Sequence, residues 1–281
     1  MNRLDYSSPL GEQVKSLPGL VDAQLEACFD KETLHNLLSI SEIHDIRKIY
    51  VTGCGDCICA AGAMEEVLAR FTGVFNCEAI ESMTFTRFTT AADIGIGEPN
   101  NPLVIGITAG GGTARVAEVL EKANHVGALS MALTNKVPSR ASEAAKKTLL
   151  LNTPKMENDF PGLRSYFASI IGLIALACRI GHVKNILPPT APEEFQAAIS
   201  SYVYSFEPVM DKIDEQMFEV AKIWKDLTRF NFIGSGSQLH SAIFALDKFY
   251  ECNGVVANYS DAEDWCHIDY HLKNPESIGT V

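Results

Sequence analysis

The chain has 281 residues, enough for one large domain or two ordinary ones, and its 47% hydrophobic and 21% charged residues are typical of a globular protein. The net charge is −12 and the isoelectric point is near 5.0, which argues against nucleic acid and anionic membranes as partners. The opening MNRLDYSSPLGEQVKS has no apolar run of the signal-peptide type, so we expect a cytoplasmic protein with eight free thiols.

Helical and β-rich patterns alternate through the first two thirds of the chain. After a helical N-terminal stretch, the expected strands lie in IRKIYVTG, FNCEAIESMTF, NPLVIGITA, GALSMALTN and KTLLLNT, with helical segments between them. This alternation predicts an α/β fold with a parallel sheet covered by helices on both faces. The closing run, YFASIIGLIALACRIG (166–181), is too short to span a bilayer comfortably and is expected to be a helix buried on most sides.

A proline-rich stretch, ILPPTAPEEF (186–195), interrupts this alternation, and two helical stretches follow it. The unit FNFIGSGSQLHSAIFALDKFYECNG then repeats the strand, G-x-G and helix pattern of IYVTGCGDCICAAGAMEEVLARFTG. We therefore divide the chain into a helical segment (1–44), a first domain (45–185), a linker with helices (186–228) and a partial second copy (229–281). Because that copy is short, either further chain is missing or it packs on the first domain or a partner subunit.

The stretch VIGITAGGGTARVAEVL (104–120) passes from a strand to a helix through three glycines. A helix N-terminus presents unpaired N–H groups with partial positive charge, and glycines let an anion approach them. Thr113 lies where the helix is expected to begin, so its hydroxyl can cap the helix or donate to a ligand oxygen. We interpret the turn as an anion-binding site at the carboxyl end of a strand; the alternative is a tight turn without a ligand.

These motifs together resemble the sugar isomerase (SIS) family. GCGDCICAA, ITAGGGTARVAEVL and ALTN resemble the first half of an SIS domain, and FIGSGSQLHSAIFALDKFYECNG resembles the start of a second one. Tandem SIS domains occur in phosphosugar aldose–ketose isomerases, the isomerase half of glucosamine-6-phosphate synthase and fructosamine-6-phosphate deglycases. The resemblance implies a five-stranded, flavodoxin-like parallel sheet and a sugar-phosphate site between domains and subunits of a homodimer or higher homo-oligomer.

The first loop of the family reads G-x-G-x-S, and its serine helps to hold phosphate. In this chain Gly53 and Gly55 match the glycines, whereas Cys57 stands at the serine position. A thiol is a poor hydrogen-bond donor, and each lost charge-assisted hydrogen bond weakens binding by roughly 1.5–3 kcal/mol. The resemblance therefore implies a phosphate held less tightly, or a different anionic group.

The second loop of the family reads S-x-S-G-x-T. Thr108 replaces the first serine and keeps a hydroxyl, whereas Gly110 replaces the second serine and offers only its backbone N–H. Gly111 and Thr113 match the family pattern, with Gly112 between them. The resemblance implies that this loop contributes backbone and hydroxyl donors to the phosphate site.

The catalytic residues that the resemblance implies lie in the second copy. Glu251, in DKFYECNG, matches a glutamate that moves a proton between C1 and C2, and His267, in EDWCH, matches a histidine that handles ring opening, often across the subunit interface. Lys248, one turn before Glu251, could stabilise an enediolate or simply pair with the glutamate. Glu157 matches a family acidic position and could serve the ligand or a helix dipole.

Other chemistries are less well supported. CGDC (54–57) is a C-x-x-C motif, but no second pair stands at zinc spacing, and the G-x-G turn explains its glycine better than a redox site would. No G-x-S-x-G motif indicates a serine hydrolase. We therefore expect no metal or cofactor, and two functions remain open: an isomerase, deglycase or deaminase acting through an enediol or enediolamine intermediate, or a non-catalytic regulatory protein that binds sugar phosphate.

Overall fold

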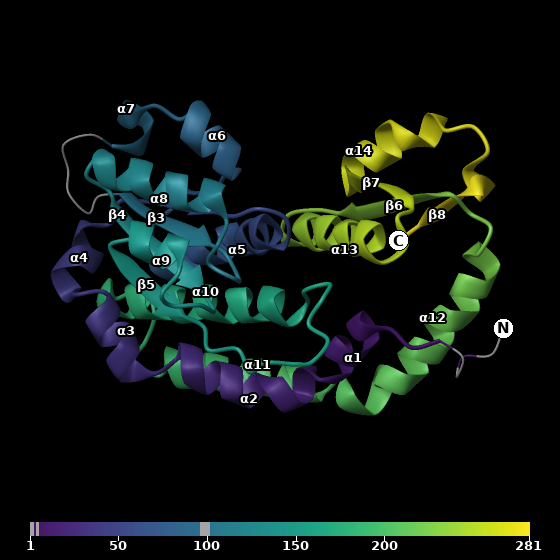
Figure 1. Ribbon diagram of the computed structural model, residues 1–281, viewed down its shortest axis with the longest axis horizontal. Helices are drawn as coiled ribbons and strands as arrows, with labels where there is room; N and C mark the ends of the chain where they lie inside the picture. Colours follow the sequence, from purple (N-terminus) through teal and green to yellow (C-terminus); the bar gives the residue numbers. More distant parts are fainter. Residues whose placement is uncertain (1–2, 4–5, 96–101) are drawn as a thin grey trace.

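Two parallel β-sheets form the frame of the structure, a computed structural model that describes Arg3, residues 6–95 and residues 102–281. The first sheet contains β1 (Lys48–Thr52), β2 (Cys77–Ala79), β3 (Pro102–Ile107), β4 (Leu129–Thr134) and β5 (Lys147–Leu150). The second contains β6 (Arg229–Gly234), β7 (Val256–Asp261) and β8 (Ile278–Thr280). Figure 1 shows the two sheets on opposite sides of the molecule.

The first sheet has the strand order β2-β1-β3-β4-β5, with every neighbouring pair parallel. The central strands β3 and β4 are buried at every residue, which explains their nearly unbroken apolar sequences, PLVIGI and LSMALT. Pro102 opens β3, where its missing N–H interrupts no pairing in the middle of the sheet. The predicted five-stranded parallel α/β sheet is confirmed.

Helices cover both faces of this sheet. The N-terminal helices are α1 (Pro9–Lys15), α2 (Leu17–Cys28), α3 (Lys31–Leu37) and α4 (Ile40–Asp45). The others in this part are α5 (Asp56–Thr72), α6 (Ser82–Arg87), α7 (Ala91–Ile94), α8 (Ala114–His125), α9 (Arg140–Ala144) and α10 (Arg164–Val183). The main core packs α2 to α5 and α10 on one face, through strand residues such as Ile49 and Ile105, and smaller clusters pack α6 to α9 on the other, through Tyr50 and Val104.

Helix α10 is long and apolar enough to cross a membrane by length and composition alone. Its most apolar window of 18 residues is, however, 61% buried inside the protein, and the helix packs against α5 in the main core. A core helix passes the same length and composition test, so the expected buried helix is confirmed.

Two further helices, α11 (Ala191–Tyr204) and α12 (Met210–Trp224), connect the two sheets, with a short 3-10 helix (Glu207–Val209) between them. In Figure 1, α11 lies beside α2, and α12 leads away from them toward β6. The Lys15 ammonium lies 3.0 Å from a carboxylate oxygen of Asp211, and Arg3 pairs with Asp214, so the N-terminal region is tied to α12. No residue of α12 is buried.

The second sheet has the order β7-β6-β8, and α13 (Ser237–Asn253) packs on it through a small core that includes Phe230, Phe232 and Leu246. Beyond β7 lie α14 (Ala262–His267) and two short 3-10 helices, Asp269–His271 and Pro275–Ser277. The turn before α13 repeats the turn before α5, because Gly55 has φ 56° and ψ −129° and Gly236 has φ 56° and ψ −130°. That this part is an incomplete second copy of the first domain stays a prediction.

Candidate functional site

The first loop, residues 53–57, turns the chain sharply from β1 into α5. A Cβ at Gly53 would lie 2.5 Å from the Cβ of Cys57, so only glycine allows the helix to begin this close to the strand. Gly55 adopts a positive φ of 56°, which side chains disfavour. The two glycines of the motif are thus explained by the turn itself.

Buried hydroxyl groups hold this loop from behind. The Ser82 hydroxyl donates to the carbonyl oxygen of Gly53 at 2.8 Å, and the Thr52 and Ser82 hydroxyl oxygens lie 2.9 Å apart. Because Ser82 uses its proton on Gly53, Thr52 is the donor to Ser82. Both hydroxyls are buried, so the loop is supported by a satisfied polar pair rather than by solvent.

The second loop, residues 108–113, leads from β3 into α8. Gly111 has φ 70°, and a Cβ there would lie 2.2 Å from the Ser139 hydroxyl oxygen, so this glycine is required by both conformation and space. The Ala141 N–H donates to the Gly111 carbonyl oxygen at 2.9 Å. The N-terminal end of α9 therefore fixes the loop from one side.

The opposite side of the second loop is open. A Cβ at Gly110 or Gly112 would meet no other atom within 4 Å. Thr113 is the N-cap of α8, yet its hydroxyl makes no capping hydrogen bond and lies 3.1 Å from the hydroxyl of the nearly buried Thr108. One of these two hydroxyl protons bridges the pair, and the other is not used in this contact. That the loop binds an anion stays a prediction.

Cys57 joins the two loops. The backbone N–H of Ala109 donates a hydrogen bond toward its sulfur, and burial raises the pKa of the thiol to about 11. Cys57 is therefore a neutral thiol at physiological pH, and it is not poised as a nucleophile. Where a serine would offer a hydroxyl, this chain offers a weak donor between two glycine-rich turns.

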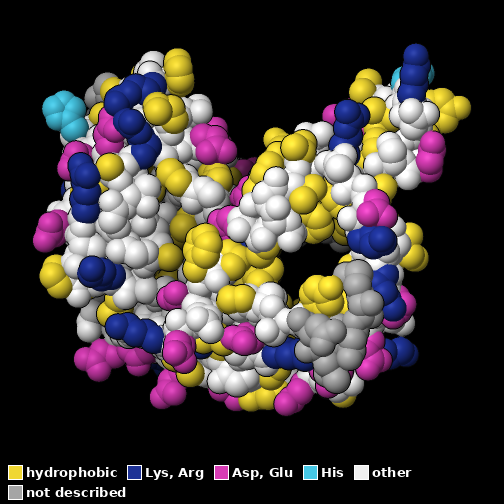
Figure 2. Space-filling model, turned by 45° about the vertical axis from the view of Figure 1, so that its right-hand side comes forward, with side chains coloured by type: hydrophobic (Ala, Val, Ile, Leu, Met, Phe, Trp, Pro, Cys, Tyr) yellow, Lys and Arg dark blue, Asp and Glu magenta, His cyan; other side chains and the backbone are white. Residues whose placement is uncertain are grey.

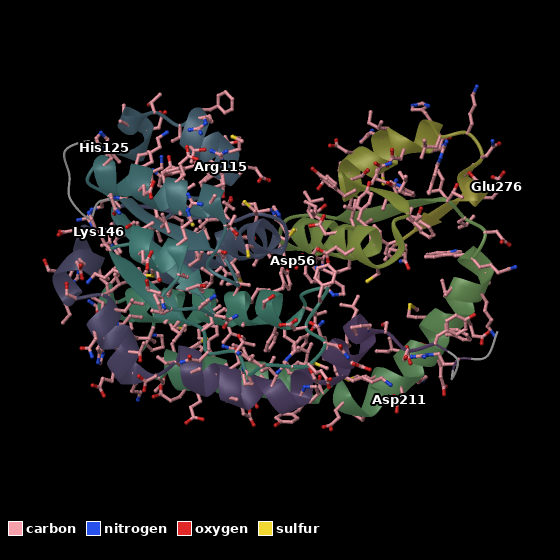
Figure 3. The ribbon with its side chains drawn as sticks, in the orientation of Figure 1. Asp56, Arg115, His125, Lys146, Asp211 and Glu276 are labelled. Atoms are coloured by element: carbon pink, nitrogen blue, oxygen red, sulfur yellow. The ribbon has the colours of Figure 1, made fainter. Side chains whose placement is uncertain are left out.

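Three charged side chains meet where α5 contacts α13. The Lys248 ammonium, whose residue is only 5% exposed, lies 2.7 Å from an Asp56 carboxylate oxygen and 2.6 Å from one of Glu251. Asp56 is the first residue of α5 and belongs to the first loop, so this contact brings Lys248 and Glu251, two of the three residues predicted to be catalytic, to that loop. Figure 3 labels Asp56 where the two helices meet.

The electrostatics of this cluster are set by burial and by the shared lysine. Burial raises the pKa of Asp56, the Lys248 ammonium lowers it, and the nearby Glu251 and Asp247 raise it again, so that the net shift is upward. Burial alone would lower the pKa of Lys248, but its hydrogen bonds to Asp56 and Glu251 outweigh that effect and raise it. The lysine is thus an ammonium at neutral pH.

The remainder of the α5–α13 contact is tightly packed. The Cys59 sulfur lies 3.6 Å from a carboxylate oxygen of Asp247, and Gly62 lies against the ring of His240. At the start of α10, Tyr166 stacks on Phe244 of α13, with 3.9 Å between ring centroids. Figure 2 shows an open hollow between the part that carries α6 and α8 and the part that carries α14, with acidic side chains near its base.

Two predicted site residues lie away from this cluster. Glu157 is exposed in the loop between β5 and α10. His267 ends α14 with its side chain 71% exposed, and its Nε2 lies 2.9 Å from Glu263 Oε1. Within the described ranges, neither residue has a hydrogen bond to Lys248, Asp56 or Glu251. Their predicted roles therefore stay predictions.

Sequence reasoning missed Asp56 and Ser82. Asp56 lies inside the motif GCGDC, between the glycine and the cysteine that were chosen, and a carboxylate in the first turn of a helix after G-x-G was the available signal. Ser82 had no such signal, because it supports the loop from a different helix. In the described part of the chain, no three His, Cys, Asp or Glu side chains are grouped to hold a metal ion.

Sequence comparison places the chain near one curated enzyme. No protein-family model matches it. It is 25% identical over 226 residues to a glutamine–fructose-6-phosphate aminotransferase (isomerizing) of Streptococcus pneumoniae, which covers 78% of this chain and 36% of the relative. The chain thus spans about a third of the length of the curated relatives it matches.

Solved structures share its fold. The C-terminal domain of glucosamine-fructose-6-phosphate aminotransferase from Francisella tularensis superposes with a TM-score of 0.81 at 14% identity, covering 100% of this chain and 77% of that one. The tagatose-6-phosphate ketose/aldose isomerase from Escherichia coli superposes with a TM-score of 0.66 at 16% identity, covering 98% and 72%. At such identities the likeness shows the fold.

Proposed function

We propose that this chain, which belongs to the sugar isomerase (SIS) family, binds a phosphorylated sugar or amino sugar and catalyses aldose–ketose isomerisation or a related deglycase or deaminase reaction. The names of its relatives support a sugar phosphate as the ligand, since one acts on fructose 6-phosphate and another is a tagatose-6-phosphate isomerase. The proposal includes a cytoplasmic homodimer or higher homo-oligomer.

The phosphate binds at the second loop. Gly110 and Gly112 leave the backbone uncovered, and the N-terminus of α8 adds partial positive charge where the loop ends. The hydroxyl pair Thr108–Thr113 supplies one further donor. Gly53, Gly55 and Cys57 form the neighbouring wall.

The chemistry takes place at Glu251. Its carboxylate removes the proton from C2 of an open-chain aldose, the C–H electron pair forms the C1–C2 double bond, and the carbonyl oxygen at C1 takes a proton from solvent to give the enediol. The proton held by Glu251 can exchange with solvent while the enediol is bound. Glu251 then protonates C1 as the double bond reforms to oxygen at C2, and the O2 hydroxyl proton is released to solvent. The Lys248 ammonium, 2.6 Å from Glu251, stabilises negative charge that develops on the enediol oxygens.

His267 is assigned to ring opening. Its exposed position at the end of α14, where its side chain pairs with Glu263, is consistent with a residue that completes the site of a partner subunit. Glu157 is also exposed, lies in the loop that leads to α10 and is assigned to ligand binding.

The contact that carries this proposal is the Asp56–Lys248–Glu251 cluster, because it joins the anion-binding loops to the carboxylate that would move the proton. The test is exchange of solvent deuterium into C1 or C2 of hexose, hexosamine and fructosamine 6-phosphates. Exchange by the wild type that Glu251→Gln abolishes is the expected result. Glu66→Gln is the matched control, because Glu66 is an exposed glutamate paired with Arg70 on the surface of α5.

A second function, non-catalytic binding of a sugar phosphate by a regulatory protein, is favoured by one observation. Cys57 and Gly110 both lack the hydroxyl that the family motifs carry at those positions. Ligand-induced stabilisation in a thermal-shift assay without any isotope exchange would decide for this alternative and against the enzyme.

A further inference from the structure

This inference rests on the proposed function and concerns the residue through which the two halves of the site are joined. Lys248 has three N–H donors, and two of them are accounted for by Asp56 Oδ2 at 2.7 Å and Glu251 Oε2 at 2.6 Å. The ammonium also lies 4.9 Å from the centroid of the Phe244 ring. The side chain is 6% exposed, so water contributes little to its solvation.

The other groups that face Lys248 do not replace Asp56. On α13, Asp247 is directed to the Cys59 sulfur at 3.6 Å, and it acts on the lysine only through its charge. The Cys57 and Cys252 thiols have raised pKa values and are neutral at physiological pH, and burial raises the pKa of the Tyr166 phenol to about 12. The two direct anionic partners of the ammonium are therefore Asp56 and Glu251.

Burial disfavours the ammonium form of a lysine and a carboxylate in contact favours it, so the loss of one of two carboxylate partners lowers the pKa of the ammonium and makes its proton easier to lose or to share with the remaining carboxylate. Either outcome harms isomerisation, because a neutral amine does not stabilise an enediolate and a protonated Glu251 cannot accept a proton from carbon. A second carboxylate on the far side of the ammonium keeps the proton on nitrogen. Asp56 has this place, and its helix begins in the first loop.

We propose that Asp56 is a positioning residue that holds Lys248 as an ammonium directed at the Glu251 carboxylate and keeps both side chains aligned with the anion-binding loops. In this arrangement Lys248 is an electrostatic group rather than an amine nucleophile. The Asp56 oxygen that does not contact Lys248 is buried and has no hydrogen-bond partner among the residues that the structure describes, an unfavourable placement that the ion pair offsets.

The test is a direct measurement of the pKa of Lys248, with lysine labelled by 13C at Cε, in the full chain. The signal of Lys248 is identified by its loss in Lys248→Met. In Asp56→Asn we expect that pKa to fall by about 1–3 units relative to the wild type, since an opposite charge in contact is removed. Asp247→Asn is the matched control, and a clearly smaller shift is expected because Asp247 does not touch the ammonium.

An unchanged pKa of Lys248 in Asp56→Asn, or an equal fall in Asp247→Asn, overturns the proposal. Asp56→Ser serves as a second variant if Asp56→Asn does not fold, because serine is the residue that follows G-x-G in the second such turn of the chain, at Ser237. Asp56→Glu retains the negative charge and should leave the pKa of Lys248 close to its wild-type value.

Kinetics separate this proposal from the proposed function. If the wild type catalyses exchange, Asp56→Asn should lower kcat at least tenfold and leave KM within about threefold of the wild-type value. The alkaline limb of its pH profile of kcat should move to lower pH, because the pKa of Lys248 falls. A merely structural role would not move that limb. If the wild type catalyses no exchange, the proposed enzyme fails, while the NMR titration still decides the role of Asp56.

Discussion

Gly62 of α5 faces the imidazole ring of His240 on α13, and a Cβ at Gly62 would lie 2.1 Å from Cε1 of that ring. This glycine therefore sets how closely the two helices approach each other. Since Asp56 and Lys248 meet across the same pair of helices, the spacing at Gly62 also governs the distance between those charges.

The first prediction tests this spacing. Gly62→Ala forces the ring aside and should lower the free energy of unfolding by about 1–3 kcal/mol, measured in urea. Adding His240→Ala removes the clash and should recover part of the loss. Gly19→Ala in α2 is the control, because a Cβ there meets nothing within 4 Å and alanine favours a helix, so it should stabilise by about 0.5–1 kcal/mol. Equal effects at Gly62 and Gly19 would contradict the interpretation.

The second prediction concerns the open backbone of the second loop. Gly112→Ala adds a methyl group where no atom lies within 4 Å, so the melting temperature of the free protein should stay nearly unchanged. If an anion binds that backbone, the same methyl group should remove most of the thermal stabilisation by a hexose 6-phosphate. Gly111→Ala, by contrast, should destabilise the free protein, because Gly111 has φ 70° and faces Ser139. If a hexose 6-phosphate raises the melting temperature of Gly112→Ala as much as that of the wild type, this loop is excluded as the phosphate site.

The third prediction concerns the hydroxyl pair of that loop. Thr113→Val removes a donor that lies 3.1 Å from the Thr108 hydroxyl and should weaken sugar-phosphate binding by roughly 1.5–3 kcal/mol, about 10- to 150-fold in Kd by calorimetry. Thr108→Val removes the other member of the pair. Because the two hydroxyls act through one shared hydrogen bond, the double variant should cost less than the two single variants combined. Full additivity would indicate that each hydroxyl binds the ligand independently.

The fourth prediction concerns alkaline pH. Burial raises the pKa of Cys28 and Cys57 to about 11 and that of Cys77 and Cys178 to about 12, from an ordinary value of 9.0. Above about pH 9 these thiols ionise in the unfolded chain but not in the folded one, so the folded state binds more protons and stability falls as pH rises. The free energy of unfolding should therefore be lower at about pH 10 than at about pH 8. Cys178→Ala should flatten this dependence, and an unaltered slope would count against the burial of that thiol.

The fifth prediction concerns the predicted contribution of His267 across a subunit interface. Glu251→Gln and His267→Asn should each be inactive in deuterium exchange when pure. Mixing and reassembling the two variants should restore roughly a quarter of the wild-type sites, because half of the dimers would contain one intact pair. No recovery in a mixture shown to exchange subunits would rule out a shared site.

Local sequence determined the elements of this fold and its glycine-rich turns. Strands such as PLVIGI and amphipathic helices such as ARVAEVLEKANH differ in hydrophobic period, and that difference depends only on neighbouring residues. Gly55 and Gly111 were identifiable for the same reason, since positive φ is a property of one residue. The predicted order of strands and helices followed from these local signals.

Only the tertiary structure decided which charges meet. Asp56 and Lys248 are 192 positions apart, and their contact depends on the spacing of two helices, which no periodic pattern of either helix encodes. The same holds for Ser82 behind the first loop and for the exposed position of His267 on α14. Periodicity reports which face of an element is buried, whereas the partner on that face depends on the packing of all elements at once. This packing brings the distant Lys248 into contact with Asp56 at the first glycine-rich turn.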